Sequence, residues 1–388
     1  MKTKTDVVII GGGVSGCALA YYLTKSGVKD VVLLEKNYLT SGASGQCAGG
    51  LRTLTTSDIK IKLAKKSRVL FQRLQEDTGF TQDVELNDQG YLILAYSEKS
   101  VEAIRKTLPF QIARGVAIER IDNKALKKLF PKLSTDGLLD AVLHKEGATI
   151  NPHLATFAYA QAAGKMGAHF YTGTKVIGLK MSRGRIDSVV TLKGEISASI
   201  VVNAAGLAFN AINEMAGIES FPMDLECIDA WVTSPVEKIR SPALTISYMD
   251  PFFLVSQRKS GNLYFLGNAR NYRGIPDSYR DADTLNTICS TFEFICRVLP
   301  DFKNMKIIRH WMGAIPVSPD THPILGKTEA VENLYLAGLL SGHGFTLAPM
   351  IGNVLADTII GRQPEISIEG LDLGRFDRGE LLEAHGLL

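Results

Sequence analysis

Asp6-Val-Val-Ile-Ile-Gly-Gly-Gly-Val-Ser-Gly16 is the stretch that decides the fold, because a short apolar run passes directly into closely spaced glycines. Residues 6–10 are suited to a strand buried on both faces. Residues 17–27 follow with helical apolar spacing and a glycine stop, and residues 30–35 repeat the strand pattern. The N-terminal segment therefore predicts a βαβ unit with the glycines in its first turn.

The glycines have the spacing GxGxxG, formed by Gly11, Gly13 and Gly16. Between a strand and a helix this motif binds a dinucleotide, because the glycines allow a tight turn and a close approach of backbone to pyrophosphate at the helix N-terminus. Glu35 ends the next strand, where a carboxylate can accept hydrogen bonds from a ribose. The expected site also includes three neighbours of these positions, Val14, Ser15 and Lys36.

Composition narrows the class of protein. A chain of 388 residues, 45 % hydrophobic and 21 % charged, is typical of a globular protein with two interleaved domains. Lysine and arginine (43) barely outnumber aspartate and glutamate (40), without a basic stripe, so nucleic acid is not expected as a partner. Five scattered cysteines without a CxxC pair predict neither disulfides nor a metal site. We expect a cytoplasmic protein without a membrane span, because no apolar run is long enough.

Two glycine-rich strand ends later in the chain indicate whether the dinucleotide is FAD or a nicotinamide cofactor. Residues 199–204 are strand-like and lead into Ala205-Gly206, and a further strand ends at Ala337-Gly338 before the segment 341–346 and a helix over residues 345–361. An extended FAD, whose flavin lies far from its adenine, needs such distant contacts. A nicotinamide cofactor is the alternative, and it requires these segments to be coincidental.

Four segments add a family resemblance: residues 42–52, 319–326, 341–345 and 375–380. With the glycine motif they resemble the D-amino acid oxidase (DAO) superfamily of FAD-dependent oxidoreductases, over nearly the whole chain. Within its glycine oxidase and sarcosine oxidase branch, the chain is most similar to the β subunits of heteromeric L-proline dehydrogenases and sarcosine oxidases. The resemblance implies hydride transfer from the C–H next to nitrogen of a proline, hydroxyproline, sarcosine, glycine or opine type of substrate to flavin N5. Electrons would pass to a partner α-type subunit or another acceptor.

The expected architecture is an α/β fold with two discontinuous domains. A Rossmann-like FAD-binding domain of the GR2 type takes residues 1–85, 141–215 and 308–388. An α+β substrate domain takes residues 86–140 and 216–307, and the alternating pattern over residues 222–270 predicts that its sheet is mainly antiparallel.

The resemblance also implies which residues contact FAD. The segment after the acidic strand would wrap the flavin and ribityl chain through Ser44, Gly45, Gln46, Gly50 and Leu51. The remaining contacts would come from Val176, Ala205, Gly206, Gly338, Gly342, His343, Gly344, Phe345 and Thr346. The helix that starts in this last stretch should direct its N-terminal dipole at the charge that collects near flavin N1. For His343 we expect a packing role rather than acid-base chemistry.

Three residues are expected to act on the substrate. Arg52 matches the arginine that binds the substrate carboxylate in sarcosine oxidases, and its planar fork suits that task. Thr346 falls where monomeric sarcosine oxidase has a second basic residue for the same carboxylate, so that contribution is absent or replaced here. Tyr248 and Phe253 are the candidates for the pocket wall, whereas Trp231, Phe252 and Gln257 are expected to lie mostly in the core.

Departures from the monomeric oxidases complete the sequence-based hypothesis. Their flavin-linked cysteine would fall near Gly313, so FAD is expected to be noncovalent. Their oxygen-activating lysine would fall at about Phe265, which favours a dehydrogenase over an oxidase. The histidine that tethers an FMN in heterotetrameric sarcosine oxidase would fall near Pro152 and His153, and a noncovalent FMN at a subunit interface is compatible with the resemblance. A flavin subunit that only relays electrons, or has no catalytic role, is the alternative function.

Overall fold

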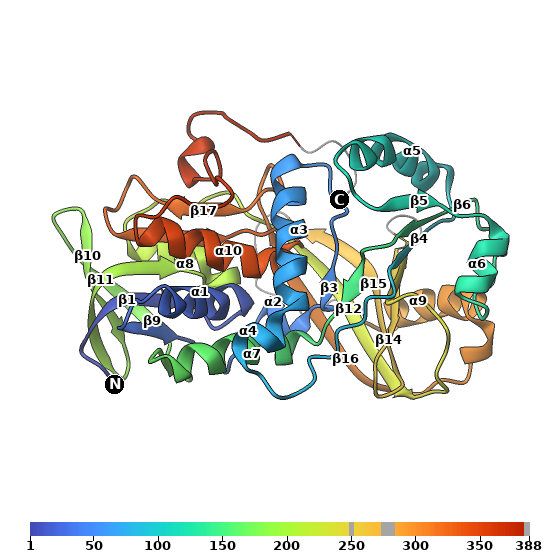
Figure 1. Cartoon of the computed structure of the whole chain (residues 1–388), viewed down its shortest axis with the longest axis horizontal. Helices are drawn as coiled ribbons and strands as arrows, with labels where there is room; N and C mark the ends of the chain where they lie inside the picture. Colours follow the sequence, from blue (N-terminus) through green and yellow to red (C-terminus); the bar gives the residue numbers. More distant parts are fainter. Residues whose placement is uncertain (248–251, 273–283, 384–388) are drawn as a thin grey trace.

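The computed structural model describes residues 1–247, 252–272 and 284–383 of the chain. Two eight-stranded sheets organise the molecule, and they occupy opposite halves of its long axis (Figure 1). The first sheet contains the N-terminal strand, and the second contains the long strands after residue 223. The expected α/β fold with a FAD-binding half and a mainly antiparallel half is confirmed.

The first sheet has the strand order β17-β18-β11-β1-β2-β8. Five of these strands are parallel and β17 joins the edge in antiparallel orientation. A hairpin of β9 and β10 extends β11 on one side. The bounds are Lys4–Ile10 (β1), Val31–Leu34 (β2), His169–Tyr171 (β8), Val176–Ser182 (β9), Arg185–Thr191 (β10), Gly194–Asn203 (β11), Ile324–Lys327 (β17) and Leu334–Gly338 (β18).

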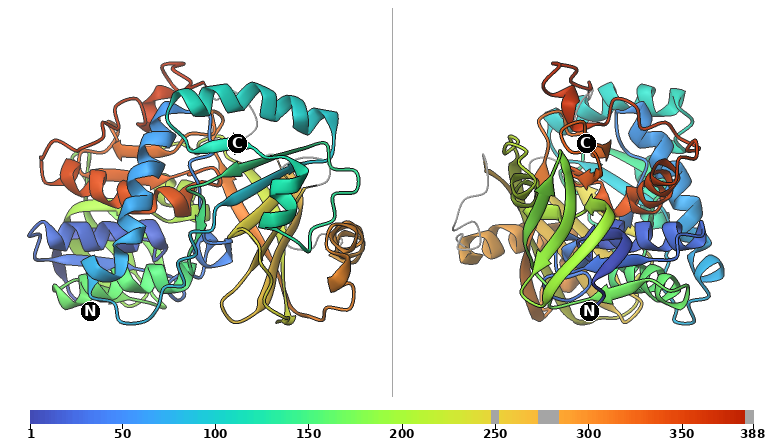
Figure 2. Two further views of the ribbon diagram at one scale, coloured as in Figure 1. Left: turned by 45° about the vertical axis from the view of Figure 1, so that its right-hand side comes forward. Right: turned by 90° about the vertical axis from the view of Figure 1, so that its left-hand side faces the viewer.

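Helices cover both faces of this sheet, which explains the unbroken apolar run of β1. Val7 and Ile9 pack into one core with α1 (Val14–Lys25), α7 (Pro152–Lys165) and α10 (Gly344–Ile359). Val8 and Ile10 pack into a second core on the opposite face with α8 (Phe209–Met215). Figure 2 shows these layers from two further directions.

The second sheet has the order β16-β12-β15-β14-β13-β4-β6-β5 and is antiparallel except between β13 and β4. One face packs against α6 (Asn123–Leu129) and α9 (Thr284–Val298), and the other against α5 (Glu98–Ala113) and the segment around residues 48–54. Its strands are Tyr91–Ala95 (β4), Ile118–Arg120 (β5), Asp140–His144 (β6), Asp224–Pro235 (β12), Leu244–Ser247 (β13), Phe253–Gln257 (β14), Asn262–Tyr272 (β15) and Ile307–Val317 (β16).

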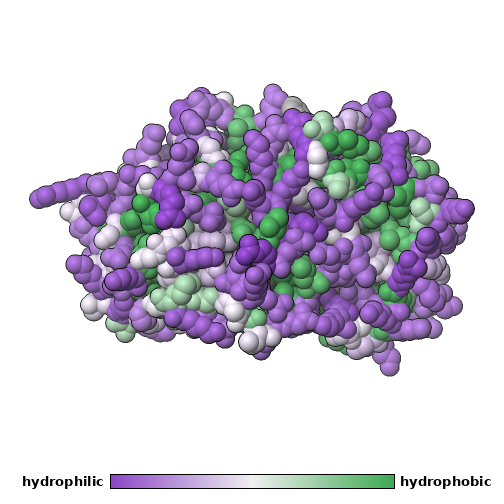
Figure 3. Space-filling model, in the orientation of Figure 1, coloured by the Kyte–Doolittle hydropathy of each residue, from purple (hydrophilic) through white to green (hydrophobic). Residues whose placement is uncertain are grey.

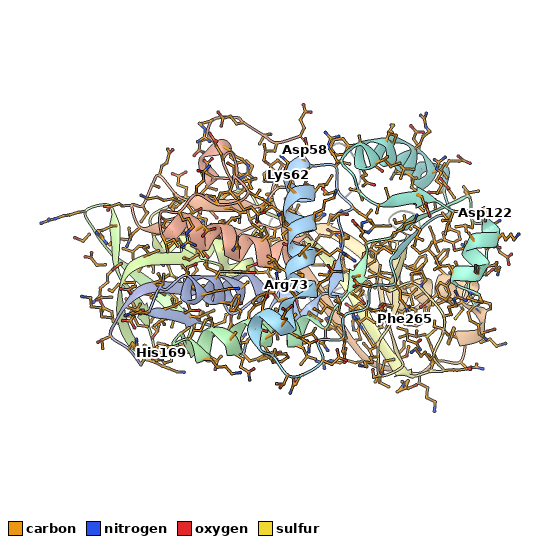
Figure 4. The ribbon with its side chains drawn as sticks, viewed as in Figure 1. Asp58, Lys62, Arg73, Asp122, His169 and Phe265 are labelled. Atoms are coloured by element: carbon orange, nitrogen blue, oxygen red, sulfur yellow. The ribbon has the colours of Figure 1, made fainter. Side chains whose placement is uncertain are left out.

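Short elements and one long helix connect the two halves. The segment after β2 forms α2 (Ala43–Gln46) and β3 (Gly50–Leu51), which pairs with β7 (Ala148–Thr149). The helix α3 (Asp58–Gln72) then crosses between the halves, with Asp58, Lys62 and Arg73 labelled along it in Figure 4. The remaining elements are α4 (Leu74–Thr78) and three 3₁₀ turns, η1 (Gly206–Ala208), η2 (Pro300–Phe302) and η3 (Leu373–Arg375).

Sheet membership differs from the expected domain ranges at two strands. Residues 141–144 of β6 and 308–317 of β16 were expected in the FAD-binding domain, but both strands pair within the second sheet. The reason is hydrogen bonding: β16 pairs with β12 over its length, which a boundary placed by sequence pattern alone does not reveal. The domain ranges themselves stay a prediction.

The surface shows no single dominating apolar area on the face seen in Figure 3. That face is mostly hydrophilic, with hydrophobic groups interspersed, more of them on the right where the second sheet lies. Within the described part of the chain, no helix is both long and apolar enough to cross a membrane. All five cysteines lie in described ranges and are free of disulfides, and no cluster of His, Cys, Asp or Glu among the described residues could hold a metal ion.

Candidate FAD and substrate site

The carboxyl ends of β18, β11, β1 and β2 lie side by side at one edge of the first sheet. The glycine turn after β1, the Ala205-Gly206 segment after β11 and the Gly338 end of β18 therefore meet there. This edge is where doubly wound sheets bind dinucleotides. Gly11 has φ of +121° and a Cβ on it would lie 2.3 Å from the carbonyl oxygen of Ala204, so only glycine fits this turn.

Glu35 lies at the same edge and holds the glycine turn through its carboxylate. Its Oε2 accepts a 2.8 Å hydrogen bond from the Gly12 amide, and its Oε1 accepts bonds from Asn37 N (2.8 Å) and Ser41 Oγ (3.2 Å). Lys36 is exposed beside it. Val176 begins β9, two residues after Thr174, whose amide donates to the Glu35 carbonyl. The expected adenosine contacts are thus neighbours in space, and a ribose contact of Glu35 stays a prediction.

The start of α1 offers an anion site at the glycine turn. Its N-cap is Gly13, which has no side chain, and its first turn carries no acidic residue. The Ser44 hydroxyl accepts a 3.0 Å hydrogen bond from the Val14 amide, which shows that an oxygen can reach this helix end. Backbone N–H groups at a helix N-terminus suit a pyrophosphate for the same reason.

The segment 42–52 is held closely against its surroundings. A Cβ on Gly50 would lie 2.0 Å from the Tyr91 hydroxyl oxygen, and one on Gly45 would lie 2.3 Å from the Thr40 carbonyl oxygen. The Gln46 carbonyl oxygen accepts hydrogen bonds from Trp311 Nε1 (3.2 Å) and the Tyr264 hydroxyl (3.4 Å) of the second sheet. Glycines at 45 and 50 are therefore required by neighbouring protein atoms.

The turn 338–346 lies against this segment. Thr346 Oγ1 donates a 2.8 Å hydrogen bond to the Gly50 carbonyl oxygen, and Phe345 stacks on Phe71 with ring centroids 5.4 Å apart. A Cβ on Gly338 would strike the Phe209 ring, and one on Gly344 would strike Leu340. By contrast, a Cβ on Gly206 would meet no atom within 4 Å, and one on Gly342 would meet only Ile315 Cγ2 at 4.0 Å. Gly206 and Gly342 thus border open space rather than protein atoms.

Arg52 emerges beside this turn. Its Nη2 donates to the Gly342 carbonyl oxygen at 3.4 Å, a long hydrogen bond, and its Nε is buried without a partner among the described residues. A buried guanidinium nitrogen without a partner is costly unless a ligand meets it. The geometry fits a carboxylate ligand for Arg52.

His343 is the N-cap of α10, is buried, and has its Nδ1 3.0 Å from the Ser341 carbonyl oxygen. Burial, with the positive charges of Arg52 and Lys60, holds its pKa well below the usual range, so the ring is neutral. Lys60 on α3 is fully buried, its Nζ donates to the Thr321 carbonyl oxygen at 3.3 Å, and burial lowers its pKa to about 8. Sequence reasoning missed Lys60, because a lysine on a helix of mixed charge gives no sign of burial.

The expected pocket wall is wrong in part. Phe253 and Trp231 belong to the core between the second sheet and α9, and Phe253 packs on Phe294 rather than facing a ligand. Phe265 lies in the right half of Figure 4 and packs on Phe292 in the same core. The adjacent Tyr264, which bonds Gln46, projects the other way. Because strand side chains alternate, a cation at position 265 would point away from the FAD-binding half, and the argument for a dehydrogenase from Phe265 loses its support.

Four further residues concern the expected pocket, and the structure shows where three of them lie. Tyr248 lies outside the described residues. Gln257 bonds the backbone of Glu237, Ile239 and Gly261, a structural role. Gly313 faces Gln46, whose Cβ is 3.7 Å from a Cβ built on the glycine. Glu226 of β12 was missed; it is half-buried and electrostatically coupled to Arg52.

A cavity of about 700 Å³ opens between the two halves, and Gly45 and Gln46 of α2 form part of its lining. His153, Arg258 and Arg309 supply basic groups to its lining, and Tyr264 and Trp311 supply aromatic rings. The Arg258 guanidinium lies 4.8 Å from the centre of the Tyr264 ring and donates to the Ala48 carbonyl oxygen at 2.9 Å. Thr40 Oγ1 is 2.7 Å from His153 Nδ1.

Fold and site together define a two-domain flavoprotein oxidoreductase, with a dinucleotide edge in one sheet and a second sheet beside the expected flavin position. The chain belongs to the DAO family, described as FAD dependent oxidoreductase, whose model matches residues 6–358. FAD is therefore its cofactor, and the nicotinamide alternative is excluded.

Relatives and solved structures agree with this family. The chain is 29 % identical to the sarcosine oxidase subunit beta of Rhizobium meliloti (strain 1021), over 99 % of this chain and 91 % of that protein. The L-proline dehydrogenase from P. horikoshii is similar with a TM-score of 0.90 and 29 % identity, covering 98 % of this chain and 100 % of that one. The glycine oxidase from Bacillus cereus ATCC 14579 has a TM-score of 0.80 and 25 % identity, covering 92 % and 98 %.

Proposed function

We propose that the chain oxidises a secondary or small amino acid of the proline, hydroxyproline, sarcosine, glycine or opine type, with FAD supplying at N5 the acceptor for the hydride that leaves the carbon next to nitrogen. The observation that carries this proposal is Arg52, whose buried Nε has no partner in the described part of the chain and which lies beside the turn 338–346. The names of the similar proteins, which act on sarcosine, L-proline and glycine, support the same substrate class.

The chain's own residues would bind and orient the substrate. Arg52 would hold the carboxylate with two parallel N–H donors, which fixes the direction of the carbon chain. The first-turn amides of α10, from Gly344 onward, would stabilise negative charge that gathers at the helix N-terminus. Thr346 of α10 bonds Gly50, which precedes Arg52 by two residues. The Arg52 guanidinium and the first-turn amides of α10 therefore keep a fixed separation. Positioning and electrostatics of this kind supply rate enhancement without a residue that attacks the substrate.

Electrons are proposed to leave through a partner α-type subunit or a separate acceptor. The similarity to a protein named as a beta subunit supports such a partner. A second flavin, FMN, at that interface is supported by the cavity of about 700 Å³, because its aromatic rings suit a flavin and its arginines suit a phosphate. Flavins released by heat from the purified complex and separated by chromatography test this point: FAD alone would contradict it.

The alternative function is a subunit whose flavin only relays electrons, or which has no catalytic role. Its site would need no substrate carboxylate at Arg52. The buried Arg52 Nε, which meets no partner in the ranges that the structure describes, favours catalysis in this chain, since a relay gives no reason to bury it.

A single anaerobic experiment tests the proposal. The FAD-loaded protein is mixed in turn with L- and D-proline, hydroxyproline, sarcosine, glycine and an opine while the oxidised flavin absorption is followed. Bleaching by one of them is the expected result and identifies the substrate class. A yellow protein that none of them bleaches, with or without its partner subunit, would favour the relay function. Subsequent reoxidation by oxygen, compared with a dye acceptor, separates an oxidase from a dehydrogenase.

A further inference from the structure

Glu226 on β12 projects toward the FAD-binding half of the molecule. Its direct partner across the ladder is Ile315 of β16, and paired residues project to the same face. Trp311 and Gly313 precede Ile315 by four and two residues on β16, so they share that face. Both lie against Gln46 of α2, Trp311 through a 3.2 Å hydrogen bond. Glu226 therefore lies on the surface that faces the expected flavin position.

Arg52 reaches the same region from the FAD-binding half. Its Nη2 bonds the carbonyl oxygen of Gly342, and Ile315 Cγ2 lies 4.0 Å from the position of a Cβ on Gly342. Ile315 therefore neighbours Glu226 within the sheet, and its side chain lies near Gly342, the residue that Arg52 contacts. Burial raises the pKa of the Glu226 carboxyl, and the positive charge of Arg52 opposes that rise in part.

The two charges do not satisfy each other. Within residues 1–247, 252–272 and 284–383, no hydrogen bond or ion pair engages the Glu226 carboxylate, including with Arg52. Arg52 Nε is buried without a partner over the same ranges. Partly buried groups of opposite charge that remain unpaired are suited to a ligand that carries both opposite charges. An amino acid zwitterion is such a ligand.

We infer that Glu226 receives the amine end of the substrate and accepts its proton while Arg52 holds the carboxylate, an inference that rests on the proposed function. One N–H bond of the substrate ammonium breaks and one O–H bond forms on Glu226. The electron pair of the broken bond stays on nitrogen as its lone pair, so the step involves no oxidation. That lone pair is what departure of a hydride from the adjacent carbon requires. Glu226 then returns the proton to water.

The other titratable groups around this site are unsuited to this step. They are Arg52 from the segment after β3, whose charge acts on Glu226, and two groups that lie near Arg52, Lys60 from α3 and His343 from the turn before α10. The first two are cations that repel an ammonium group. His343 has a pKa held far below the usual range by burial and by these cations, so it is a weak proton acceptor. Of these four groups, Glu226 alone combines a negative charge with a raised pKa.

The first test follows anaerobic flavin reduction against pH in Glu226→Gln. Asp224→Asn is the control, because Asp224 is an exposed carboxylate on the same strand. Near neutral pH we expect Glu226→Gln to slow reduction by about 100-fold, the usual scale for a lost proton acceptor. The rate should recover as pH approaches the pKa of the substrate amine, because the free amine then needs no acceptor. A rate that is unchanged, or lowered equally at every pH, would overturn the inference.

The second test does not depend on turnover. Trimethylglycine and 3,3-dimethylbutyrate have nearly the same shape and both carry a carboxylate, but only the first carries a positive charge. Their affinities are measured from the shift of the oxidised flavin spectrum. The cationic compound should bind about 10-fold more tightly to the parent protein and no more tightly to Glu226→Gln. If the parent protein binds the two compounds with equal affinity, the role of Glu226 is refuted, even when an amino acid bleaches the flavin. If the cationic compound binds more tightly but no amino acid bleaches the flavin, only the proposed oxidation is refuted.

Discussion

Thr346 and Gly50, 296 residues apart in the chain, are joined by a 2.8 Å hydrogen bond from the threonine hydroxyl to the glycine carbonyl oxygen. The bond links the first turn of α10 to β3, the two segments expected to border the flavin. Thr346 falls where monomeric sarcosine oxidase has a basic residue for the substrate carboxylate. In this chain the Thr346 hydroxyl instead donates to the backbone, and we predict that it positions Gly50 for the cofactor.

Replacing Thr346 with valine should weaken FAD binding. The change leaves the partly buried Gly50 carbonyl without its donor, at a cost of about 1–3 kcal/mol. We expect the dissociation constant of FAD, measured by fluorescence titration of the apoprotein, to rise about 10-fold. Thr346→Ser retains the hydroxyl and should bind FAD like the parent. If the valine variant binds equally well, the bond does not order the site.

Replacing Arg52 with alanine should raise the KM for every carboxylate substrate. Charge-assisted hydrogen bonds contribute about 1.5–3 kcal/mol each, which corresponds to an increase of at least about 10-fold. Lys62→Ala removes an exposed positive charge from α3 and serves as the control. Steady-state kinetics with the substrate found by flavin bleaching give the answer. An unchanged KM would show that Arg52 does not bind the carboxylate.

Gly206→Ala and Gly217→Ala form a matched pair. Both glycines have positive φ, +58° and +76°, and a Cβ on either meets no protein atom within 4 Å. Each change therefore costs about the same strain, roughly 1–2 kcal/mol. Only Gly206 lies at the dinucleotide edge, so only Gly206→Ala should also weaken FAD binding in the fluorescence titration. Equal FAD affinities in the two variants would show that Gly206 does not border the cofactor.

Arg375→Met should destabilise the fold. The Arg375 guanidinium is fully buried and makes two hydrogen bonds to Asp320, 2.9 and 3.0 Å long. Removing one partner of such a pair leaves a buried charge at a cost of about 3–5 kcal/mol. Arg378→Met breaks only exposed pairs with Asp372 and Glu380 and should cost under about 1 kcal/mol. Urea unfolding of both apoproteins measures the difference. Similar losses of unfolding free energy in the two variants would contradict a stabilising role of the buried Arg375–Asp320 pair.

His144 should make the protein sensitive to acid. Its side chain is fully buried, its Nε2 is 2.7 Å from Thr53 Oγ1, and burial, with a smaller effect of Arg68, lowers its pKa to about 3. The unfolded chain takes up a proton below about pH 6.5 that the folded chain does not take up until near pH 3. Stability contributed by neutral His144 is therefore present above pH 6.5 and is lost as pH falls, by about 1.4 kcal/mol per pH unit.

His144→Gln removes this titration while keeping a polar group near Thr53. Between pH 7 and pH 5 the parent should lose about 2 kcal/mol more stability than the variant. His169→Gln replaces an exposed histidine and should follow the parent (Figure 4). Urea titration at the two pH values measures the free energy of unfolding. If the parent and His144→Gln lose the same unfolding free energy between pH 7 and pH 5, the lowered pKa of His144 is contradicted.

Long apolar segments were predictable because their periodicity records burial directly. The predicted βαβ unit appears as β1, α1 and β2, and the helix predicted over residues 345–361 appears as α10 over Gly344–Ile359. Short elements such as α2 and β3 were not predicted, because four and two residues carry no period. They form through contacts with Tyr91, Trp311 and Thr346, all distant in sequence.

Residue orientation on the second sheet was less predictable. Phe253 and Phe265 were assigned to the flavin side or beside it, yet both pack into the core under α9. One residue along β15, Tyr264 faces the other way. A strand rich in apolar residues on both faces gives no alternation from which its inner face could be read.

The sequence by itself determined the dinucleotide fold, its glycine turn at Gly11 and the family, because these depend on local patterns of glycine and apolar residues. Tertiary structure alone decided which side chains meet at the proposed substrate position. Glu226 and Arg52 lie on different elements and in different halves of the molecule, and only the register of β12 with β16 turns the carboxylate toward the guanidinium. The local sequence determines whether a segment forms a helix or a strand. A site depends on side chains from different elements lying close together, and those distances are set only when the sheets pack.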